Sequence, residues 1–138
     1  MSIERRNVFA RFVNDLKTLS KCVDMQNAAI VTDGNLSQVL SIGINGGPKG
    51  LEDCLCHTAE KYGCVHAEMN ALIKCMSAEP GKAMFVTTSP CKQCAGAIIN
   101  FPGGFEVVYY IKQWKNTLGL ELLERAGIRT VWIGDEVI

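Results

Sequence analysis

The second half of the chain alternates strand-like and helix-like segments in an order that few folds can accommodate. Residues 82–88, 105–111 and 128–133 form short apolar runs rich in β-branched and aromatic side chains, which is typical of buried strands. Helical patterns at 91–100 and 115–127 separate these runs. Strands that are joined through a helix run parallel, with right-handed crossovers. We therefore expect three parallel strands with helices packed against them.

The first half adds a hairpin and two helices to this unit. Apolar residues recur at helical spacing over 3–21, and 66–78 has a second helical pattern. Between them, 27–32 and 36–45 are β-rich runs separated by an Asp-Gly-Asn turn, which is a strong hairpin signal. We predict a single domain over 1–138 with a three-layer α/β/α fold. Its five-stranded mixed sheet should have three parallel strands at the end of the chain.

Composition restricts the class of protein. Of the 138 residues, 48% are apolar and 20% are charged, which is typical of a globular chain. Basic and acidic residues number 14 each and form no basic stripe, so binding to long nucleic acid is not expected. The charged N-terminal segment lacks the apolar core of a secretory signal, and no run approaches 18 apolar residues. We expect a soluble, cytoplasmic protein without membrane contact.

Three residues of the types that zinc prefers stand at two predicted helix starts. Because the chain has seven cysteines and no export signal, reduced thiols or metal ligands are more plausible than a disulfide framework. Cys91 and Cys94 are three apart in the first turn of a helix, so both sulfurs can reach one ion, and His66 adds an imidazole. Ser89 is the expected N-cap of that helix, with Pro90 at its first position. Three protein ligands leave a fourth position for water, as in catalytic zinc sites.

Glu68 is the residue that could act on such a water. At the first turn of a helix, His66 and Glu68 can both face an ion beyond the helix end, where the positive dipole favours thiolate and hydroxide. Zinc lowers the pKa of water from 15.7 to about 7. A neighbouring carboxylate can then accept the proton and return it elsewhere.

Each half of this pattern has a plainer interpretation when it stands alone. Cys-x-x-Cys in a cytosolic chain also suits a redox pair, and His-x-Glu at a helix start also suits a surface pair. His-x-Glu followed by Pro-Cys-x-x-Cys, however, is the signature of zinc-dependent nucleobase deaminases. Here the two parts are "HAE" at 66–68 and "PCKQC" at 90–94. The combination favours a catalytic zinc.

With these motifs the sequence resembles the cytidine deaminase superfamily, and within it the deoxycytidylate (dCMP) deaminases. The resemblance covers nearly the whole chain. Two segments point to dCMP deaminases within the superfamily: "GINGGPKG" (43–50) is similar to their glycine-rich loop, and "HAEMNA" (66–71) is similar to their helix start. Ile44 stands where that family usually has tyrosine. The resemblance implies an α/β/α fold, homo-oligomers that are commonly hexamers, and hydrolysis of dCMP to dUMP and ammonia in the supply of dTTP precursors.

The resemblance also implies a role for each residue of the two motifs. His66, Cys91 and Cys94 would be the zinc ligands. Glu68 would carry a proton from the activated water to N3 of cytosine and a second proton to the departing amine.

Substrate contacts are implied less directly. Asn45 would hydrogen-bond the sugar or phosphate, and the backbone near Ala67 and Ser89 would read the pyrimidine edge. Further candidates, from their positions and side-chain chemistry, are Gln26, Asn27, Lys49, Tyr109 and Trp114.

A second metal site is a further hypothesis. Residues 46–63 are expected to form a functional loop with a helical turn at 56–61. Some viral dCMP deaminases hold a structural zinc with equivalent cysteines, so a phage or viral origin is also compatible with the resemblance. The candidate ligands here are Cys22, Cys54, His57 and Cys64, and free buried thiols are the alternative.

Other functions stay open at this point. The substrate could be dCTP or another cytosine nucleotide. The same chemistry serves deaminases of bases in single-stranded nucleic acid, which need a basic channel and stacking aromatics. A zinc module without catalysis would have no need for Glu68 and would fill its fourth position with a protein ligand. We favour a dCMP deaminase in the cytoplasm, or in the host cytoplasm if a virus encodes it.

Overall fold

The centre of the molecule is a mixed β-sheet. The computed structural model of the chain describes residues 3–22, 24–51 and 63–136. Within these residues the strands are β1 (Ala28–Thr32), β2 (Val39–Ile44), β3 (Lys82–Thr88), β4 (Phe105–Lys112) and β5 (Arg129–Trp132). They lie in the order β2-β1-β3-β4-β5, with β1 antiparallel to both of its neighbours and β3, β4 and β5 parallel. The predicted five-stranded mixed sheet is confirmed.

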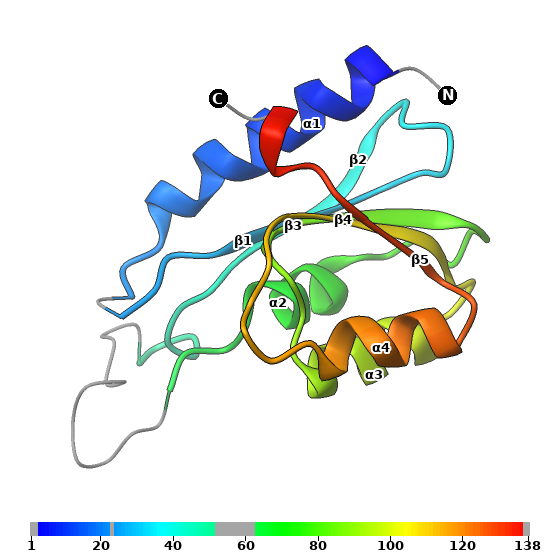
Figure 1. Cartoon of the computed structure of the whole chain (residues 1–138). Helices are drawn as coiled ribbons and strands as arrows, with labels where there is room; N and C mark the ends of the chain where they lie inside the picture. The colour runs from blue at the N-terminus through cyan, green and yellow to red at the C-terminus, as the bar shows by residue number, and fades with distance from the viewer. Residues whose placement is uncertain (1–2, 23, 52–62, 137–138) are drawn as a thin grey trace.

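Helices cover both faces of this sheet. They are α1 (Ile3–Leu16), which continues into a short 3-10 helix η1 (Lys17–Leu19), α2 (Ala67–Lys74), α3 (Lys92–Asn100), α4 (Leu118–Arg125) and the short 3-10 helix η2 (Gly134–Glu136). α1 packs on one face, and α2, α3 and α4 pack on the other (Figure 1). This arrangement confirms the predicted three-layer fold. None of the helices in the described ranges is long and apolar enough to cross a membrane.

Alternating side chains of the central strands fill one core on each side of the sheet. Phe85 and Tyr109 face α1, whereas Met84 and Val108 face the other three long helices. Because both faces are covered, β3 and β4 are buried along most of their length. The α1 side also holds Ala10, Val13, Leu16, Ile30 and Ile133, and the opposite side also holds Ala71, Leu72, Ile98, Leu120 and Leu123.

The helix predicted over 66–78 is shorter than its sequence pattern. It ends at Lys74, and Cys75 has extended backbone angles. Beyond it, the Ser77 hydroxyl donates to a carboxylate oxygen of Glu79 at 2.9 Å and accepts from the Glu79 N–H at 3.2 Å. Such local side-chain bonds offer the backbone an alternative to the helical pattern. The predicted helix over 75–78 is therefore wrong.

The predicted N-cap of α3 is also wrong. Cys91 is the N-cap, and its sulfur accepts from the Cys94 N–H at 3.5 Å. The Ser89 hydroxyl instead accepts a hydrogen bond from the N–H of Trp114 at 2.7 Å. Ser89 therefore ties the segment after β4 to the start of α3.

A close backbone approach fixes α2 against β2. Gly43 faces the first turns of α2, where a Cβ atom would overlap backbone atoms of Ala71. The Ser41 hydroxyl donates to the Ala71 carbonyl at 2.8 Å, and the Asn70 side chain donates to the Ile44 carbonyl at 2.8 Å. These contacts set the position of the N-terminus of α2. The predicted turn at 56–61, in the loop that follows β2, lies outside the described residues.

Gly43→Ala is expected to destabilise the protein by about 1–3 kcal/mol, the usual cost of overpacking. The added methyl group would meet the backbone of Ala67 and Ala71, which cannot give way without moving α2. Gly96→Ala is the matched control, because its Cβ would meet no described atom within 4 Å beyond its chain neighbours and the adjacent backbone of its own helix, and alanine favours a helix. Urea unfolding would measure both variants. Equal stability of Gly43→Ala and the wild type would contradict the close approach.

Candidate active site

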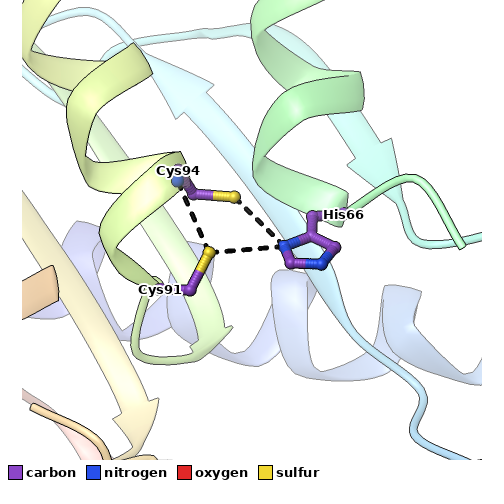
Figure 2. Close-up of side chains that lie close together, drawn as sticks. All are labelled: His66, Cys91 and Cys94. Carbon is purple, nitrogen blue, oxygen red and sulfur yellow. Dashed lines mark hydrogen bonds between the residues drawn. The ribbon is translucent and has the colours of Figure 1, made fainter. Parts of the chain in front are cut away.

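Three candidate ligands come together between the starts of α2 and α3. His66 immediately precedes α2, Cys91 precedes α3, and Cys94 lies in the first turn of α3. The Nδ1 atom of His66 lies 3.3 Å from the Cys94 sulfur and 3.6 Å from the Cys91 sulfur (Figure 2). All three ligand atoms lie within 4.8 Å of one another. One ion can therefore contact all three.

The helix starts explain why these side chains converge. His66 and Cys91 have extended backbone angles as N-cap residues, so their side chains leave the helix axis instead of following it. Figure 2 shows the His66 ring pointing from the start of α2 toward the two cysteines of α3. Helix N-termini carry partial positive charge, which stabilises thiolates. The fold thus places Cys94, a buried thiol, where the helix-end charge offsets part of the cost of burying a thiolate.

The chemistry of the donor set fits zinc. Two sulfurs and one imidazole nitrogen are the ligands of catalytic zinc sites with an open fourth position. Burial raises the pKa of the Cys94 thiol well above its usual range, and the neighbouring Glu68 and Cys91 raise it further. A bound cation reverses this effect, because it stabilises the thiolates directly. The cluster would hold zinc through Nδ1 of His66 and the sulfurs of Cys91 and Cys94.

Glu68 lies beside these ligands in the first turn of α2. Its exposed fraction is only 7%, although it lines the same cleft as His66 and Cys91. Burial raises the pKa of this carboxyl to about 7 in the metal-free protein. A carboxyl group with that environment can both accept and donate protons near neutral pH.

A cleft of about 310 Å³ opens next to the metal ligands. It lies at the carboxyl end of β3, where open α/β sheets commonly bind their ligands. The described lining residues are Cys22, Asp24, Met25, Asn27, Asn45, Gly63, Cys64, His66, Ala67, Glu68, Thr88, Ser89, Cys91 and Trp114.

Most of the residues predicted to contact substrate lie on this cleft. They are Asn27, Asn45, Ala67, Ser89 and Trp114. Gln26 and Lys49 are exposed and are not among the lining residues. Cys22 and Cys64, two candidates for a second zinc, also line the cleft, whereas Cys54 and His57 lie outside the described residues.

Tyr109 does not lie on the cleft. Its ring stacks on Phe85 with centroids 4.7 Å apart, and its exposed fraction is 3%. It belongs to the core beneath α1, on the other face of the sheet from the metal ligands. The expected contact between Tyr109 and substrate is therefore corrected. Among the candidate aromatic residues that the sequence named, Trp114 is the one that lines the cleft.

Four lining residues were missed from the sequence: Asp24, Met25, Gly63 and Thr88. Thr88 could have been found, because it is the last residue of a parallel strand and precedes the Ser-Pro-Cys motif. Asp24 and Met25 carried no such signal, since a segment without regular structure gives no periodic pattern.

Comparisons with known proteins point to one family. The family described as the cytidine and deoxycytidylate deaminase zinc-binding region matches residues 4–111. The crystal structure of dCMP deaminase from the cyanophage S-TIM5 in complex with dCMP and dUMP has a TM-score of 0.85 and 29% identity, and the match covers 96% of this chain and 99% of that one.

Two curated proteins extend the comparison. ComE operon protein 2 of Bacillus subtilis is 34% identical over an alignment of 110 residues, and the match covers 73% of this chain. The deoxycytidylate deaminase of Mus musculus is 36% identical over an alignment of 115 residues, and that match also covers 73% of this chain. The matched regions span 56% and 63% of the length of these two relatives.

Proposed function

Because the chain belongs to the cytidine and deoxycytidylate deaminase family, we propose that it hydrolyses dCMP to dUMP and ammonia. The observation that carries this proposal is the His66, Cys91 and Cys94 cluster with buried Glu68 on the wall of the same cleft. The substrate is inferred from the cyanophage enzyme, whose structure contains dCMP and dUMP. A merely structural metal site would have no need for a buried carboxylate at this place.

The reaction needs a nucleophile and two proton transfers. Zinc, when bound by the three ligands, supplies the charge that lowers the pKa of water toward 7. Glu68 accepts a proton from the attacking water and delivers it to N3 of cytosine. The water oxygen adds to C4, and Glu68 then takes the proton that remains on this oxygen and passes it to the amino nitrogen. The bond between C4 and that nitrogen breaks, ammonia leaves, and the oxygen becomes the 4-carbonyl of uracil.

Backbone groups near the ligands suit the polar edge of the base. The Ala67 N–H lies in the first turn of α2, where the helix provides no acceptor. The Ser89 N–H donates to the Lys112 carbonyl at 2.9 Å, so we assign its own carbonyl, an acceptor, to the amino group of cytosine. Trp114, whose backbone N–H is held by the Ser89 hydroxyl, lines the cleft, and we assign its ring to stacking on the pyrimidine.

A substrate panel tests this function. Wild-type protein would be mixed with dCMP, dCTP, deoxycytidine, CMP and single-stranded DNA, and the loss of cytosine absorbance would be followed. We expect kcat/KM for dCMP to exceed that of the others by at least about tenfold. A zinc chelator should abolish turnover, and added zinc should restore it. Turnover of the oligonucleotide alone, with salt-sensitive binding, would favour a polynucleotide deaminase, and no turnover of any compound would contradict the proposal.

Three further properties belong to this proposal. A second zinc would use Cys22, Cys54, His57 and Cys64; a metal content near two ions per chain would support it and a content near one would dismiss it. A homo-oligomer, with a hexamer as the favoured size, is testable by sedimentation. Zinc thiolates need reduced cysteines, which supports the cytoplasm as the compartment.

A further inference from the structure

Asn27, which immediately precedes β1, has a side-chain amide whose oxygen is held by two threonine hydroxyls. Its Oδ1 atom accepts hydrogen bonds from the hydroxyls of Thr88 at 2.7 Å and Thr87 at 3.1 Å. A carbonyl oxygen has two lone pairs, so both are used. The Nδ2 atom has no hydrogen-bond partner in the described part of the chain, and Asn27 lines the cleft. The amide therefore presents a donor, and not an acceptor, to the cleft.

Asn45 holds the backbone on which Asn27 lies. Its Oδ1 atom accepts from the Asn27 N–H at 2.8 Å, and its Nδ2 atom donates to the Met25 carbonyl at 2.7 Å. The Asn45 backbone accepts from the Ser20 hydroxyl at 2.9 Å, and only 7% of the residue is exposed. Both ends of this amide are thus engaged with the backbone of 25–27. This geometry makes Asn45 a positioning residue for Asn27, and its second amide hydrogen still leaves the predicted contact to sugar or phosphate as a prediction.

The charge on the same wall restricts what Asn27 can meet. Asp24, three residues earlier, is exposed and lines the cleft. Its carboxylate repels a phosphate group, which carries the same sign of charge. The wall formed by Asp24, Met25 and Asn27 therefore suits a neutral part of a nucleotide.

We propose that Nδ2 of Asn27 donates a hydrogen bond to a neutral oxygen of the nucleoside part of the substrate, and that Asn27 is thereby a specificity-determining residue. This inference rests on the proposed function. The oxygen is either the 2-carbonyl of the pyrimidine or the 3′-hydroxyl of the sugar, since both accept hydrogen bonds. A site built to donate to an oxygen rejects an analogue that lacks it, because the buried donor is then unpaired.

Two substitutions of Asn27 test the donor. Asn27→Ala is expected to lower kcat/KM for dCMP by about 10- to 100-fold. Asn27→Asp keeps the size of the side chain and the acceptor for Thr87 and Thr88 but replaces the donor with a second oxygen, so its loss should be at least as large. Zinc content should stay at the wild-type value in both variants, and urea unfolding should stay near it in Asn27→Asp, whereas Asn27→Ala should unfold at lower urea because Thr87 and Thr88 lose this acceptor. Asn35→Ala, an exposed hairpin residue, is the matched control and should keep full activity. A change of less than twofold in both Asn27 variants would overturn the proposal.

Analogues identify the oxygen. We would measure wild type and Asn27→Ala with 2-thio-dCMP, whose sulfur is a poor acceptor, and with 2′,3′-dideoxy-CMP, which lacks the 3′ oxygen. With one of the two analogues, wild type and Asn27→Ala should have the same kcat/KM, because that analogue already lacks the oxygen that accepts from Asn27. Equal values with the thio compound assign the base, and equal values with the dideoxy compound assign the sugar. If Asn27→Ala lowers kcat/KM for both analogues by the same factor as for dCMP, the proposed hydrogen bond is refuted.

The role of Asn45 has its own readout. If Asn45 acts through Asn27, Asn45→Ala should lose discrimination against the same analogue, and the double variant should be no worse in kcat/KM than Asn27→Ala. A merely structural role would lower stability without changing that discrimination. If the substrate panel selects another cytosine compound, the dCMP proposal fails and the Asn27 comparison is made on that compound. If wild type neither binds nor converts any of them, both proposals fail.

Discussion

Replacing Glu68 by glutamine is expected to abolish turnover while zinc stays bound. Glutamine has nearly the same size as glutamate and leaves His66, Cys91 and Cys94 in place, but it cannot accept a proton from water. Positioned proton transfer contributes about 10²–10⁴ to rates of this kind. Because Glu68 acts in both transfers, we expect kcat to fall by at least that factor. Single-turnover assays and metal analysis on the same sample would measure the two effects.

The stability of this variant provides an independent control. In the metal-free protein, burial raises the pKa of Glu68 from 4.5 to about 7, so ionising this carboxyl costs the folded state free energy. That cost is absent below the unfolded pKa, grows as the pH rises from 4.5, and is complete above 7. Metal-free Glu68→Gln should therefore be more stable than the metal-free wild type at pH 8, by on the order of 3 kcal/mol. The difference should vanish toward pH 4.5.

These two results separate the carboxylate's chemistry from folding. A variant that is inactive, metal-loaded and at least as stable as the wild type can have lost only the proton transfer. Substantial activity in metal-loaded Glu68→Gln would contradict the role of Glu68, whatever its stability. Equal stability of the two metal-free proteins at pH 8 would contradict the buried, desolvated position of the carboxyl.

The layers of the fold could be predicted because they depend on repeating patterns. Met84 and Phe85 point to opposite faces of β3, and both are buried, so that strand had to be covered on both sides by helices. The helices between the last three strands then required parallel pairing. The ends of the helices depend instead on individual side-chain hydrogen bonds, which no repeating pattern reveals. α2 stops at Lys74 because Ser77 and Glu79 bond locally, and Ser89 is engaged by Trp114, 25 residues further along the chain.

The metal ligands were easier to predict from the sequence than the substrate contacts of the cleft. His66, Cys91 and Cys94 were identifiable because zinc restricts both the type and the spacing of its ligands. Substrate contacts have no such restriction, since any polar side chain that faces the cleft can serve. Tyr109 was misassigned because position near the end of β4 does not tell which face of the sheet the ring joins. Asn45 lies on the cleft, but its amide bonds became visible only in the folded chain.

Loss of a ligand should have a different signature from loss of Glu68. Cys94→Ala is expected to lower zinc affinity by at least about a hundredfold, because even outer groups around a metal contribute 10- to 100-fold. Turnover of Cys94→Ala should fall to background because the zinc is lost. Cys75→Ala is the matched control: Cys75 is also a buried thiol, but its sulfur points to the Ser77 carbonyl at 3.6 Å and is not part of the cluster.

Both cysteine variants remove one buried sulfur, so both should lower stability through the lost packing. Metal analysis after dialysis should distinguish them, with zinc retained in Cys75→Ala and lost in Cys94→Ala. Excess zinc should restore part of the activity only if His66 and Cys91 still position the ion, because two ligands can hold zinc weakly. Full zinc content and full turnover in Cys94→Ala would show that the ion binds elsewhere. Since Glu68 has no role in holding the metal, added zinc should raise the turnover of Cys94→Ala but not that of Glu68→Gln.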